Sequence, residues 1–209
     1  MSLKNLSVKN KVPKLFKDSL NNKKINQIYQ KFKKSLNIKK DFAVAVSGGS
    51  DSFSLAFLSK IYSFEKKLRV KFFIVDHRLR PESKKEAKIV RQALNKFKIK
   101  AQILTWKGKK PVSNIQSLAR KERFRLLFEK CKKYKINNIL LGHHESDLVE
   151  NFFIRMLRGS GLNGLVSLGK KNEIGNFNLL RPLLDQKKEN LKYLSKHIFG
   201  FYIKDPSNY

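Results

Sequence analysis

The most constraining feature is a short apolar run, residues 42–46, that ends at the hexapeptide Ser-Gly-Gly-Ser-Asp-Ser and is followed by a helix-like segment, residues 53–58. A buried strand that breaks at two glycines and opens a helix leaves backbone N–H groups unpaired at the positive end of the helix dipole. The glycines admit backbone angles closed to other residues, and the serines add hydroxyl donors. The segment therefore predicts a phosphate-binding loop, whose expected nucleotide contacts are Ser47, Gly48, Gly49, Ser50, Asp51 and Ser52.

This loop differs from the familiar triphosphate loop, Gly-x-x-x-x-Gly-Lys-Ser/Thr, in which the lysine lies on the outer phosphates. No lysine occurs between Ser47 and Lys60. Ser-Gly-Gly-x-Asp-Ser resembles instead the pyrophosphate loop of the ATP pyrophosphatases, which cleave ATP between the α and β phosphates. The resemblance implies ATP as the nucleotide. The alternative is a plain Ser/Gly turn between a strand and a helix.

Strand-like and helix-like segments alternate along the chain. The expected strands are residues 42–46, 70–75, 100–106, 139–141 and 177–180. Besides the helix after the loop, the expected helices are residues 22–36, 82–97, 114–131, 145–157 and 187–196. This alternation predicts an α/β fold, a doubly wound parallel sheet with helices on both faces.

The N-terminal stretch differs from the rest. Residues 1–21 are basic and have no sustained apolar period, so we expect a flexible arm there. Residues 22–209 are then expected to form one ATP-binding catalytic domain, with enough apolar content (41%) to bury a core.

Polar groups follow three of the expected strands: the loop itself, Asp76 with His77, and His143 with His144. In doubly wound sheets ligands bind at the carboxyl ends of the strands, so these groups are expected to converge. Asp76 and His77 are therefore added to the nucleotide contacts. Asp51 is the candidate Mg²⁺ ligand, because a hard cation on a triphosphate needs a carboxylate oxygen beside the phosphates. The alternative is that Asp51 only favours the helix dipole.

Two pairs of charged residues are spaced three apart in expected helices, which puts each pair on one helix face. Asp147 and Glu150 would attract a cation, either Mg²⁺ or a substrate ammonium, unless they are simply a solvated acidic pair. Arg120 and Arg123 would suit a phosphate or the charge that develops during adenyl transfer, unless they are a surface pair. His143 is a further candidate, although a histidine at a strand end needs no function.

The charge balance favours a nucleic-acid partner. The chain of 209 residues has 47 Lys and Arg against 16 Asp and Glu, a formal net charge of +31. A cation this large attracts phosphate backbones. The alternative is compositional, because Lys, Asn, Ile and Phe are abundant together, as an AT-rich coding sequence would produce.

The remaining composition points to the cytoplasm. The single cysteine, Cys131, excludes a disulfide framework, and no apolar run approaches the length of a signal peptide or a membrane span. We therefore expect a cytoplasmic protein in a reducing setting, without a membrane partner.

Seven motifs, in order and at consistent spacing, make residues 41–209 similar to the tRNA(Ile)-lysidine synthase family. Beside the loop they are Val-Asp-His-Arg-Leu-Arg-Pro-Glu-Ser (75–83), Ala-Arg-Lys-Glu-Arg-Phe (119–124), His-His-Glu-Ser-Asp-Leu-Val-Glu-Asn (143–151), Leu-Arg-Gly-Ser-Gly (157–161), Arg-Pro-Leu-Leu (181–184) and Asp-Pro-Ser-Asn (205–208). The resemblance implies that ATP adenylates the C2 oxygen of the wobble cytidine, position 34, in tRNA(Ile) with a CAU anticodon. Free L-lysine then displaces AMP and gives lysidine.

The same resemblance implies roles for the candidates. The loop would hold the triphosphate, Asp51 would help to hold Mg²⁺, Asp147 and Glu150 would bind lysine, and Arg120, Arg123 and His143 would line the site near the phosphates and the cytosine. The chain departs from the family at four positions, Arg78, Ser146, Leu148 and Asn151. The family's C-terminal tRNA-binding domains are also expected to be absent from this chain.

Two other functions remain open from the sequence. One is another tRNA-modifying ATP pyrophosphatase of the 2-thiolating type, a chemistry that usually uses paired cysteines. The other is a non-catalytic RNA-binding remnant whose loop no longer turns over ATP.

Overall fold

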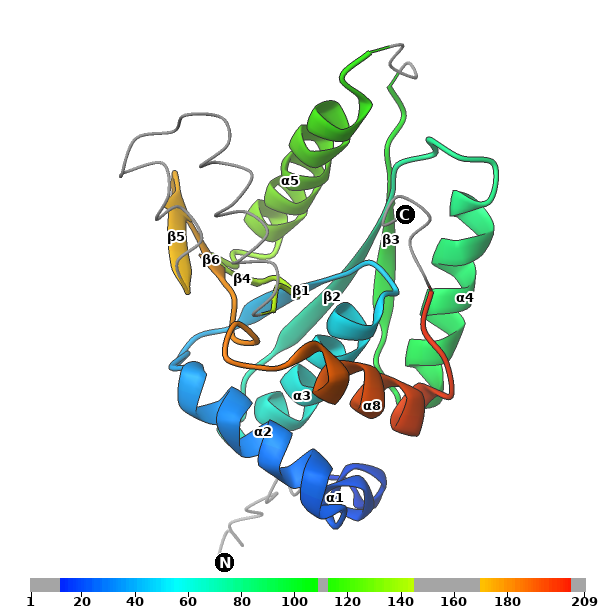
Figure 1. Cartoon of the computed structure of the whole chain (residues 1–209). Helices are drawn as coiled ribbons and strands as arrows, with labels where there is room; N and C mark the ends of the chain where they lie inside the picture. Colours follow the sequence, from blue (N-terminus) through cyan, green and yellow to red (C-terminus); the bar gives the residue numbers. More distant parts are fainter. Residues whose placement is uncertain (1–11, 109–112, 145–169, 204–209) are drawn as a thin grey trace, which may run out of the picture.

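A six-stranded sheet forms the centre of the protein (Figure 1). The computed structural model describes residues 12–108, 113–144 and 170–203, and within these ranges the strand order is β3-β2-β1-β4-β6-β5. Every strand pair is parallel except β5 with β6. The predicted doubly wound parallel sheet is confirmed. The strands are β1 (Phe42–Val46), β2 (Val70–Asp76), β3 (Ala101–Thr105), β4 (Asn138–Leu140), β5 (Lys171–Ile174) and β6 (Phe177–Leu180).

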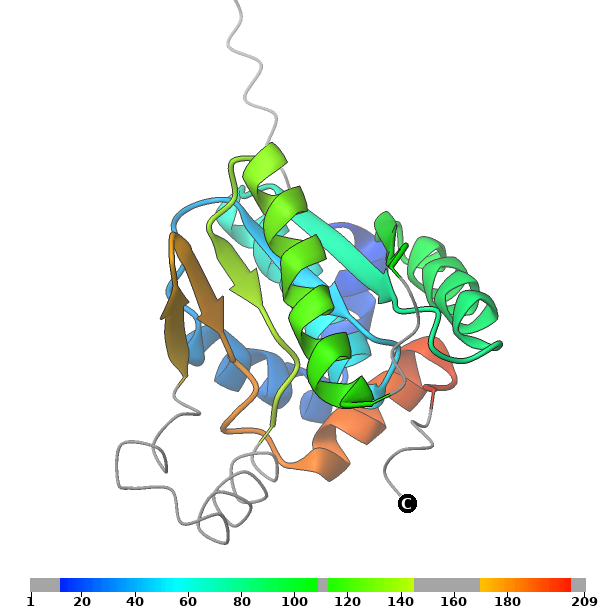
Figure 2. The ribbon, with the colours of Figure 1, turned by 90° about the horizontal axis from the view of Figure 1, so that it is seen from above.

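Helices cover both faces of the sheet. Figure 2 shows α5 on one face and the other described helices on the opposite face. The helices are α1 (Lys14–Leu20), α2 (Lys23–Ser35), α3 (Ser50–Lys66), α4 (Ser83–Lys96), α5 (Ile115–Lys133) and α8 (Lys188–Phe199). Two apolar clusters follow from this layering, because Phe42, Val44 and Val46 of β1 contribute to the larger one while Ala43 belongs to the cluster under α5.

Helix α3, which follows the loop, is the most deeply buried of the described helices. Its side chains from Ser52 to Ser59 are all buried, and it packs against the sheet, α2 and α8. A helix that is apolar around most of its circumference needs cover on all sides. Burial of α3 fixes the position of its first turn, and that turn carries the loop residues.

Helix α1 corrects the expectation of a flexible arm over residues 14–20. Phe16 is 1% exposed, and its ring lies 5.4 Å from that of Phe57 and 5.7 Å from that of Phe64, measured between centroids. Burying one phenylalanine contributes about 2 kcal/mol, enough to hold a two-turn helix against the core. Seven residues are too few to show a helical period, so the sequence pattern missed it. Residues 1–11 lie outside the described residues.

Strand β5 was also missed. Its sequence Lys-Asn-Glu-Ile is polar and mostly exposed, and it pairs only through β6, by an antiparallel hairpin with Gly175 at φ +55°. Charged residues suit an edge strand because they discourage pairing with other chains. The expected helix at residues 145–157 lies outside the described residues.

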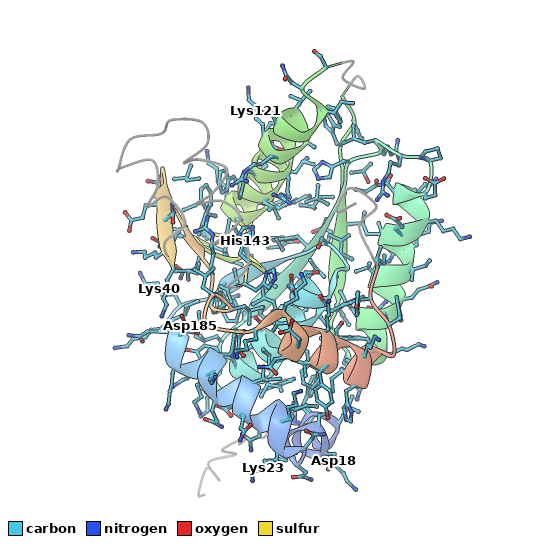
Figure 3. All side chains as sticks on the ribbon, in the orientation of Figure 1. Asp18, Lys23, Lys40, Lys121, His143 and Asp185 are labelled. Carbon is cyan, nitrogen blue, oxygen red and sulfur yellow. The ribbon has the colours of Figure 1, made fainter. Side chains whose placement is uncertain are left out.

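The basic charge is spread around the molecule. Figure 3 labels Lys23 on α2, Lys40 before β1 and Lys121 on α5, and these three lysines lie on different sides of the protein. Among the described helices, none combines the length and the apolar character needed to cross a membrane.

Candidate active site

The chain builds the sheet in one direction from β1 to β3 and in the other direction from β4 onward. The candidate site lies where these two directions meet, between β1 and β4. β1 pairs with β2 on one side and with β4 on the other, so the chain leaves the carboxyl ends of β1 and β4 in opposite directions. In open α/β sheets the crevice at such a point binds the ligand. Gly142, just after β4, lies against the first turn of α3, because a Cβ there would be 3.1 Å from the Ser52 backbone nitrogen. The two strand ends therefore meet at the loop.

The loop between β1 and α3 is wound around one hydroxyl group. Ser52 Oγ accepts hydrogen bonds from the backbone nitrogens of Ser47 (3.1 Å) and Gly48 (3.0 Å) and donates to the Gly49 carbonyl (3.0 Å). Gly48 has φ +95°, a conformation that strongly favours glycine. These contacts fix a tight turn that places the start of α3 beside the carboxyl ends of β1 and β4.

The first turn of α3 has the features of an anion site. Gly49 is its N-cap residue, and no side chain among the described residues caps the helix there. Its first N–H groups are therefore open to an anion, which the helix dipole also favours. We expected the serine hydroxyl groups to donate to the phosphate, but the structure uses them within the loop. Ser50 Oγ donates to Asp51 Oδ1 (3.0 Å), and Ser47 Oγ lies 3.2 Å from Ser52 Oγ. The donors that the loop presents to an anion are thus mainly backbone groups.

Asp51 lies between two basic side chains. Its Oδ2 is 2.9 Å from Lys188 Nζ and 3.6 Å from His144 Nδ1, and its side chain is 15% exposed. Lys188 comes from the first turn of α8 and was not among the sequence candidates. A lysine at a helix N-terminus opposes the helix dipole, and this is the signal that would have found it. The loop has no lysine of its own, and α8 supplies one from 137 residues away.

The residues present fit a Mg²⁺ ion that arrives with a nucleotide. Mg²⁺ usually keeps several waters and binds through one or two carboxylates together with substrate phosphates. Asp51 offers one carboxylate beside the anion site. Within the described parts of the chain, no group of three or more His, Cys, Asp or Glu side chains forms a resident metal site.

Asp76 is 3% exposed and is held by its own turn. Its Oδ1 accepts hydrogen bonds from the Arg78 backbone nitrogen (3.0 Å) and from Ser83 Oγ (2.9 Å). Both partners follow β2, so the carboxylate shapes the turn between β2 and α4. Arg78, where the chain departs from the family pattern, has φ +52°, which fits a position where glycine is common.

His77 and Arg123 contain buried polar atoms that the described residues leave without a hydrogen bond, Nδ1 and Nε respectively. Burial lowers the pKa of His77, and the positive charge of Arg123 lowers it further. Burial also lowers the pKa of Arg123, with Arg120 adding to the effect. Buried polar atoms in native proteins nearly always have partners, so these two atoms are open to a partner from outside the described residues.

Three arginines form a cluster, two from α5 and one from the end of β6. The guanidinium groups of Arg120 and Arg123 lie 5.9 and 5.5 Å from the centroid of the Phe124 ring, so the spacing of three does place them together. Arg181, at the end of β6, is 4% exposed, and Arg120 contributes to lowering its pKa after burial. Clustered arginines suit phosphate groups, which they bind through two parallel hydrogen bonds. Arg181 was part of a quoted motif but not of the predicted site.

The structure thus brings the candidates into two adjoining groups. The loop group contains residues 47–52 with Lys188 and His144, and the arginine group contains Arg120, Arg123, Arg181, His77 and His143. His143 and His144 are neighbours in the chain and join the groups. Asp147 and Glu150 lie outside the described residues.

The segment after α8 forms a backbone hydrogen bond with the loop between β1 and α3. The Ile203 backbone nitrogen donates to the Gly48 carbonyl at 2.9 Å, and Ile203 side-chain atoms lie within 3.6 Å of the place a Gly48 Cβ would take. This contact ties the residues after α8 directly to the anion site.

Replacing Ile203 with proline should weaken ATP binding about tenfold. Proline has no N–H, so the buried Gly48 carbonyl would lose its donor, at a cost of about 1–3 kcal/mol. Titration of the protein with a non-hydrolysable ATP analogue measures the effect. Ile203→Val keeps the N–H group and should bind the analogue like the parent chain. Equal affinity in the proline and valine variants would contradict the role of this hydrogen bond.

Comparison with known proteins agrees with this fold. Residues 18–209 match the family model described as a PP-loop domain. The solved U34-tRNA thiolase NcsA of Methanococcus maripaludis, described with its [4Fe-4S] cluster, superposes with a TM-score of 0.75 at 19% identity, over 88% of this chain and 66% of that one. That likeness concerns the fold. The chain belongs to the PP-loop family of α/β ATP-binding domains.

The curated relatives are more specific. The chain is 41% identical over 167 residues to the tRNA(Ile)-lysidine synthase of Orientia tsutsugamushi (strain Boryong), covering 79% of this chain and 37% of that protein. It is 39% identical over 170 residues to the tRNA(Ile)-lysidine synthase of Wolbachia pipientis wMel, covering 80% and 39%. The chain therefore spans less than half the length of these relatives.

Proposed function

We propose that this chain carries the ATP-using catalytic domain of a tRNA(Ile)-lysidine synthase, a ligase that forms a carbon–nitrogen bond. The substrates would be ATP, free L-lysine and tRNA(Ile) with a CAU anticodon, and the products lysidine at position 34, AMP and pyrophosphate. The observation that carries the proposal is identity of 34–41% to relatives of that name over 79–87% of this chain. The anion site at the start of α3 supports the use of ATP.

In the first step the C2 oxygen of cytidine attacks the α phosphorus. The new O–P bond forms as the bond between the α phosphorus and the bridging oxygen breaks, and pyrophosphate leaves with the electron pair. The backbone N–H groups at Ser50 and Asp51 and the ammonium group of Lys188 would hold the departing phosphates. Mg²⁺ held by Asp51 would neutralise their charge. Arg120 and Arg123 would stabilise charge on the transferred phosphoryl group.

In the second step the ε-amine of lysine attacks C2, and AMP leaves with the C2 oxygen. Adenylation makes that oxygen a good leaving group, which is why the reaction is divided into two steps. The amine must also lose a proton, and its ordinary pKa is about 10.4. Asp147 and Glu150 keep the role of lysine ligands as a proposal from the resemblance alone.

We place the reaction in the cytoplasm, without a membrane partner, because its three substrates meet there. The spread of lysines around the described surface supports a tRNA partner through phosphate contacts, which fall off with salt.

Mass spectrometry of the tRNA tests the proposal. The chain is incubated with ATP, lysine and a tRNA(Ile) transcript with a CAU anticodon, and the nucleosides are analysed after digestion. We expect C34 to gain the mass of one lysine less one water, and pyrophosphate to be released in equal amount. Pyrophosphate release that needs tRNA but leaves C34 without lysine would contradict the ligase assignment. Salt-sensitive tRNA binding with no pyrophosphate release would favour the non-catalytic remnant.

The thiolating alternative is disfavoured by cysteine chemistry. The thiolase neighbour is described with an iron–sulfur cluster, and such clusters are held by several cysteine thiolates. This chain has one cysteine, Cys131, which lies on α5 and is fully buried. Burial raises the pKa of the Cys131 thiol to about 12, so the reactive thiolate is scarce at neutral pH.

Changing Cys131 to alanine should leave the rate of pyrophosphate release within about twofold of the parent rate, because a thiol buried in an apolar cluster takes no part in the chemistry. A small loss of stability, about 1 kcal/mol, accompanies the lost sulfur. Single-turnover assays at matched folded fraction measure the rate. An inactive but folded Cys131→Ala protein would revive the sulfur-transfer alternative.

A further inference from the structure

Two side chains that have separate roles in the proposed reaction are bonded to each other in the structure. Lys188 Nζ donates to Asp51 Oδ2 at 2.9 Å, across 137 positions of the chain. Asp51 Oδ1 accepts a hydrogen bond from Ser50 Oγ at 3.0 Å, so each carboxylate oxygen already has a donor. An ammonium group thus holds the oxygen proposed for a metal ion, and a carboxylate holds the ammonium group proposed for the phosphates.

Lys188 is fixed at its backbone and adjustable at its tip. It is the first residue of α8, and Ser54 Oγ of α3 donates to the Leu191 carbonyl at 2.9 Å, about one turn further along α8. Ser54 and Leu191 are fully buried, so this contact fixes the start of α8 against α3. The Lys188 side chain is 32% exposed, and its ammonium group ends a flexible four-carbon stem. The ammonium group can therefore change its partner while the backbone stays in place.

The surroundings of this ion pair favour anions over a lone cation. Asp51 is in the first turn of α3 and Lys188 is in the first turn of α8, so the positive ends of two helix dipoles meet at the pair. Glu189, the acidic residue in the first turn of α8, is exposed. The Asp51 carboxylate thus faces two helix ends and an ammonium group, and a divalent ion that arrives alone meets repulsion.

We propose that Lys188 is an exchangeable counter-ion: its ammonium group occupies Asp51 until the phosphates of the nucleotide draw it away, and Asp51 is thereby released to bind the metal ion that accompanies them. The nucleotide and the Mg²⁺ in this statement rest on the proposed function. The exchange changes ionic partners and involves no covalent step. It makes phosphate binding and metal binding depend on each other, because Lys188 and Asp51 hold each other when both are without a ligand.

Charge and geometry favour an exchange over shared binding. Mg²⁺ binds oxygen at about 2.0–2.1 Å in a strict octahedral shell, and a second cation on the same carboxylate would repel it in this partly buried place. A phosphate oxygen offers the ammonium group a charge-assisted hydrogen bond in return. The distance to such a phosphate is short, because Asp51 itself carries one of the open N–H groups in the first turn of α3. Lys188 therefore needs only a change of side-chain conformation to reach the anion site.

Two binding measurements without tRNA test the exchange. The first titrates the protein, without nucleotide, with Mn²⁺ as a paramagnetic substitute for Mg²⁺ and follows the free ion by electron paramagnetic resonance. The second titrates the protein with inorganic pyrophosphate in the presence of EDTA, so that no metal ion takes part. Lys188→Met should bind Mn²⁺ at least about fivefold more tightly than the parent chain. The same variant should bind pyrophosphate at least about tenfold more weakly, because one charge-assisted hydrogen bond is lost.

Matched variants assign these two effects. Lys187→Met removes the exposed neighbouring lysine, changes the net charge equally and should behave like the parent chain in both titrations. Lys188→Arg keeps the positive charge and should keep Mn²⁺ binding as weak as in the parent chain. Adding Asp51→Asn to Lys188→Met should remove the gain in Mn²⁺ affinity, which assigns the bound ion to Asp51. Removing a cation from a helix N-terminus favours the helix, so Lys188→Met is expected to fold.

A purely structural role of Lys188 would not change the two affinities in opposite directions. Weaker binding of both probes by Lys188→Met would show that Lys188 only supports the loop, and would overturn the proposal. Unchanged Mn²⁺ affinity, or a gain that survives Asp51→Asn, would overturn it too. Unchanged pyrophosphate affinity would show that the ammonium group does not move to phosphate, which also overturns the exchange. A parent chain that shows the exchange but adds no lysine to C34 would count against the proposed function alone.

Discussion

Asp51→Asn should lower the rate of pyrophosphate release by about a hundredfold or more, the size of effect seen when one preorganised electrostatic group is removed from an active site. The substitution keeps the shape of the side chain and removes its charge. Lys188, 2.9 Å away, would lose its counter-ion, and a Mg²⁺ ion carried by ATP would lose the carboxylate that we propose as its ligand. Both changes should weaken the binding of the outer phosphates of ATP by Lys188 and Mg²⁺. Single-turnover release of pyrophosphate measures the rate.

Binding of tRNA should hardly change in the same variant. The phosphate contacts of a nucleic acid depend on lysines and arginines, and the labelled lysines on α2 and α5 lie far apart on the surface (Figure 3). Removing one partly buried negative charge leaves these contacts in place. The slope of log affinity against log salt concentration should match that of the parent within error. A joint loss of catalysis and of tRNA binding would show that Asp51 acts on the whole fold.

Asp185→Asn is the matched control. Asp185 also pairs with a lysine, Lys170, at 2.7 Å, but its side chain is 54% exposed and lies on the surface. Exposed pairs of this kind contribute about 0–1 kcal/mol. The control variant should release pyrophosphate at the parent rate. A similar loss of pyrophosphate release in both variants would mean that breaking any Lys–Asp pair lowers the rate, and that Asp51 has no specific role in the reaction.

The sequence was sufficient to predict the elements whose contacts are made between neighbouring residues. The strand, the two glycines and the start of α3 occupy consecutive residues, and the structure builds the loop from that short stretch. The central strands are apolar along their length because helices cover both faces of the sheet. They could therefore be recognised without an alternating pattern of apolar and polar residues. The positions of β1, β2 and β6 were therefore predicted to within a residue.

Contacts between distant residues account for what the sequence missed. Lys188 meets Asp51 across 137 residues, and Arg181 meets His143 across 38. A single lysine or arginine is hard to recognise in a chain with 47 basic residues, although Lys188 opposes the dipole of its own helix. The sequence also did not reveal that Asp76 Oδ1 accepts hydrogen bonds from Ser83 Oγ and from the Arg78 backbone nitrogen. The nucleotide contact of Asp76 stays a prediction.

Gly48→Ala should cost about 2–4 kcal/mol of stability, or distort the loop enough to abolish measurable ATP binding. Two effects combine. Gly48 has φ +95°, where an alanine is strained by about 1 kcal/mol. The added Cβ would also lie 2.5 Å from Val90 Cγ2 and 3.2 Å from Ile203 Cδ1. Overpacking of this kind in a rigid core typically costs about 1–3 kcal/mol. Urea unfolding and titration with an ATP analogue measure the two outcomes.

Gly200→Ala isolates the backbone part of that cost. Gly200 ends α8 with φ +80°, and a Cβ there would meet nothing within 4 Å. We expect a loss of only about 1 kcal/mol and unchanged affinity for the analogue. The double variant Gly48→Ala with Val90→Ala removes the nearest clashing methyl group and should recover part of the binding lost in Gly48→Ala, while Val90→Ala alone lowers stability through a small cavity. If Gly48→Ala and Gly200→Ala were equally mild, the tight packing of the loop between α4 and the segment after α8 would have no energetic consequence, and the loop would tolerate a side chain where the structure leaves room for none.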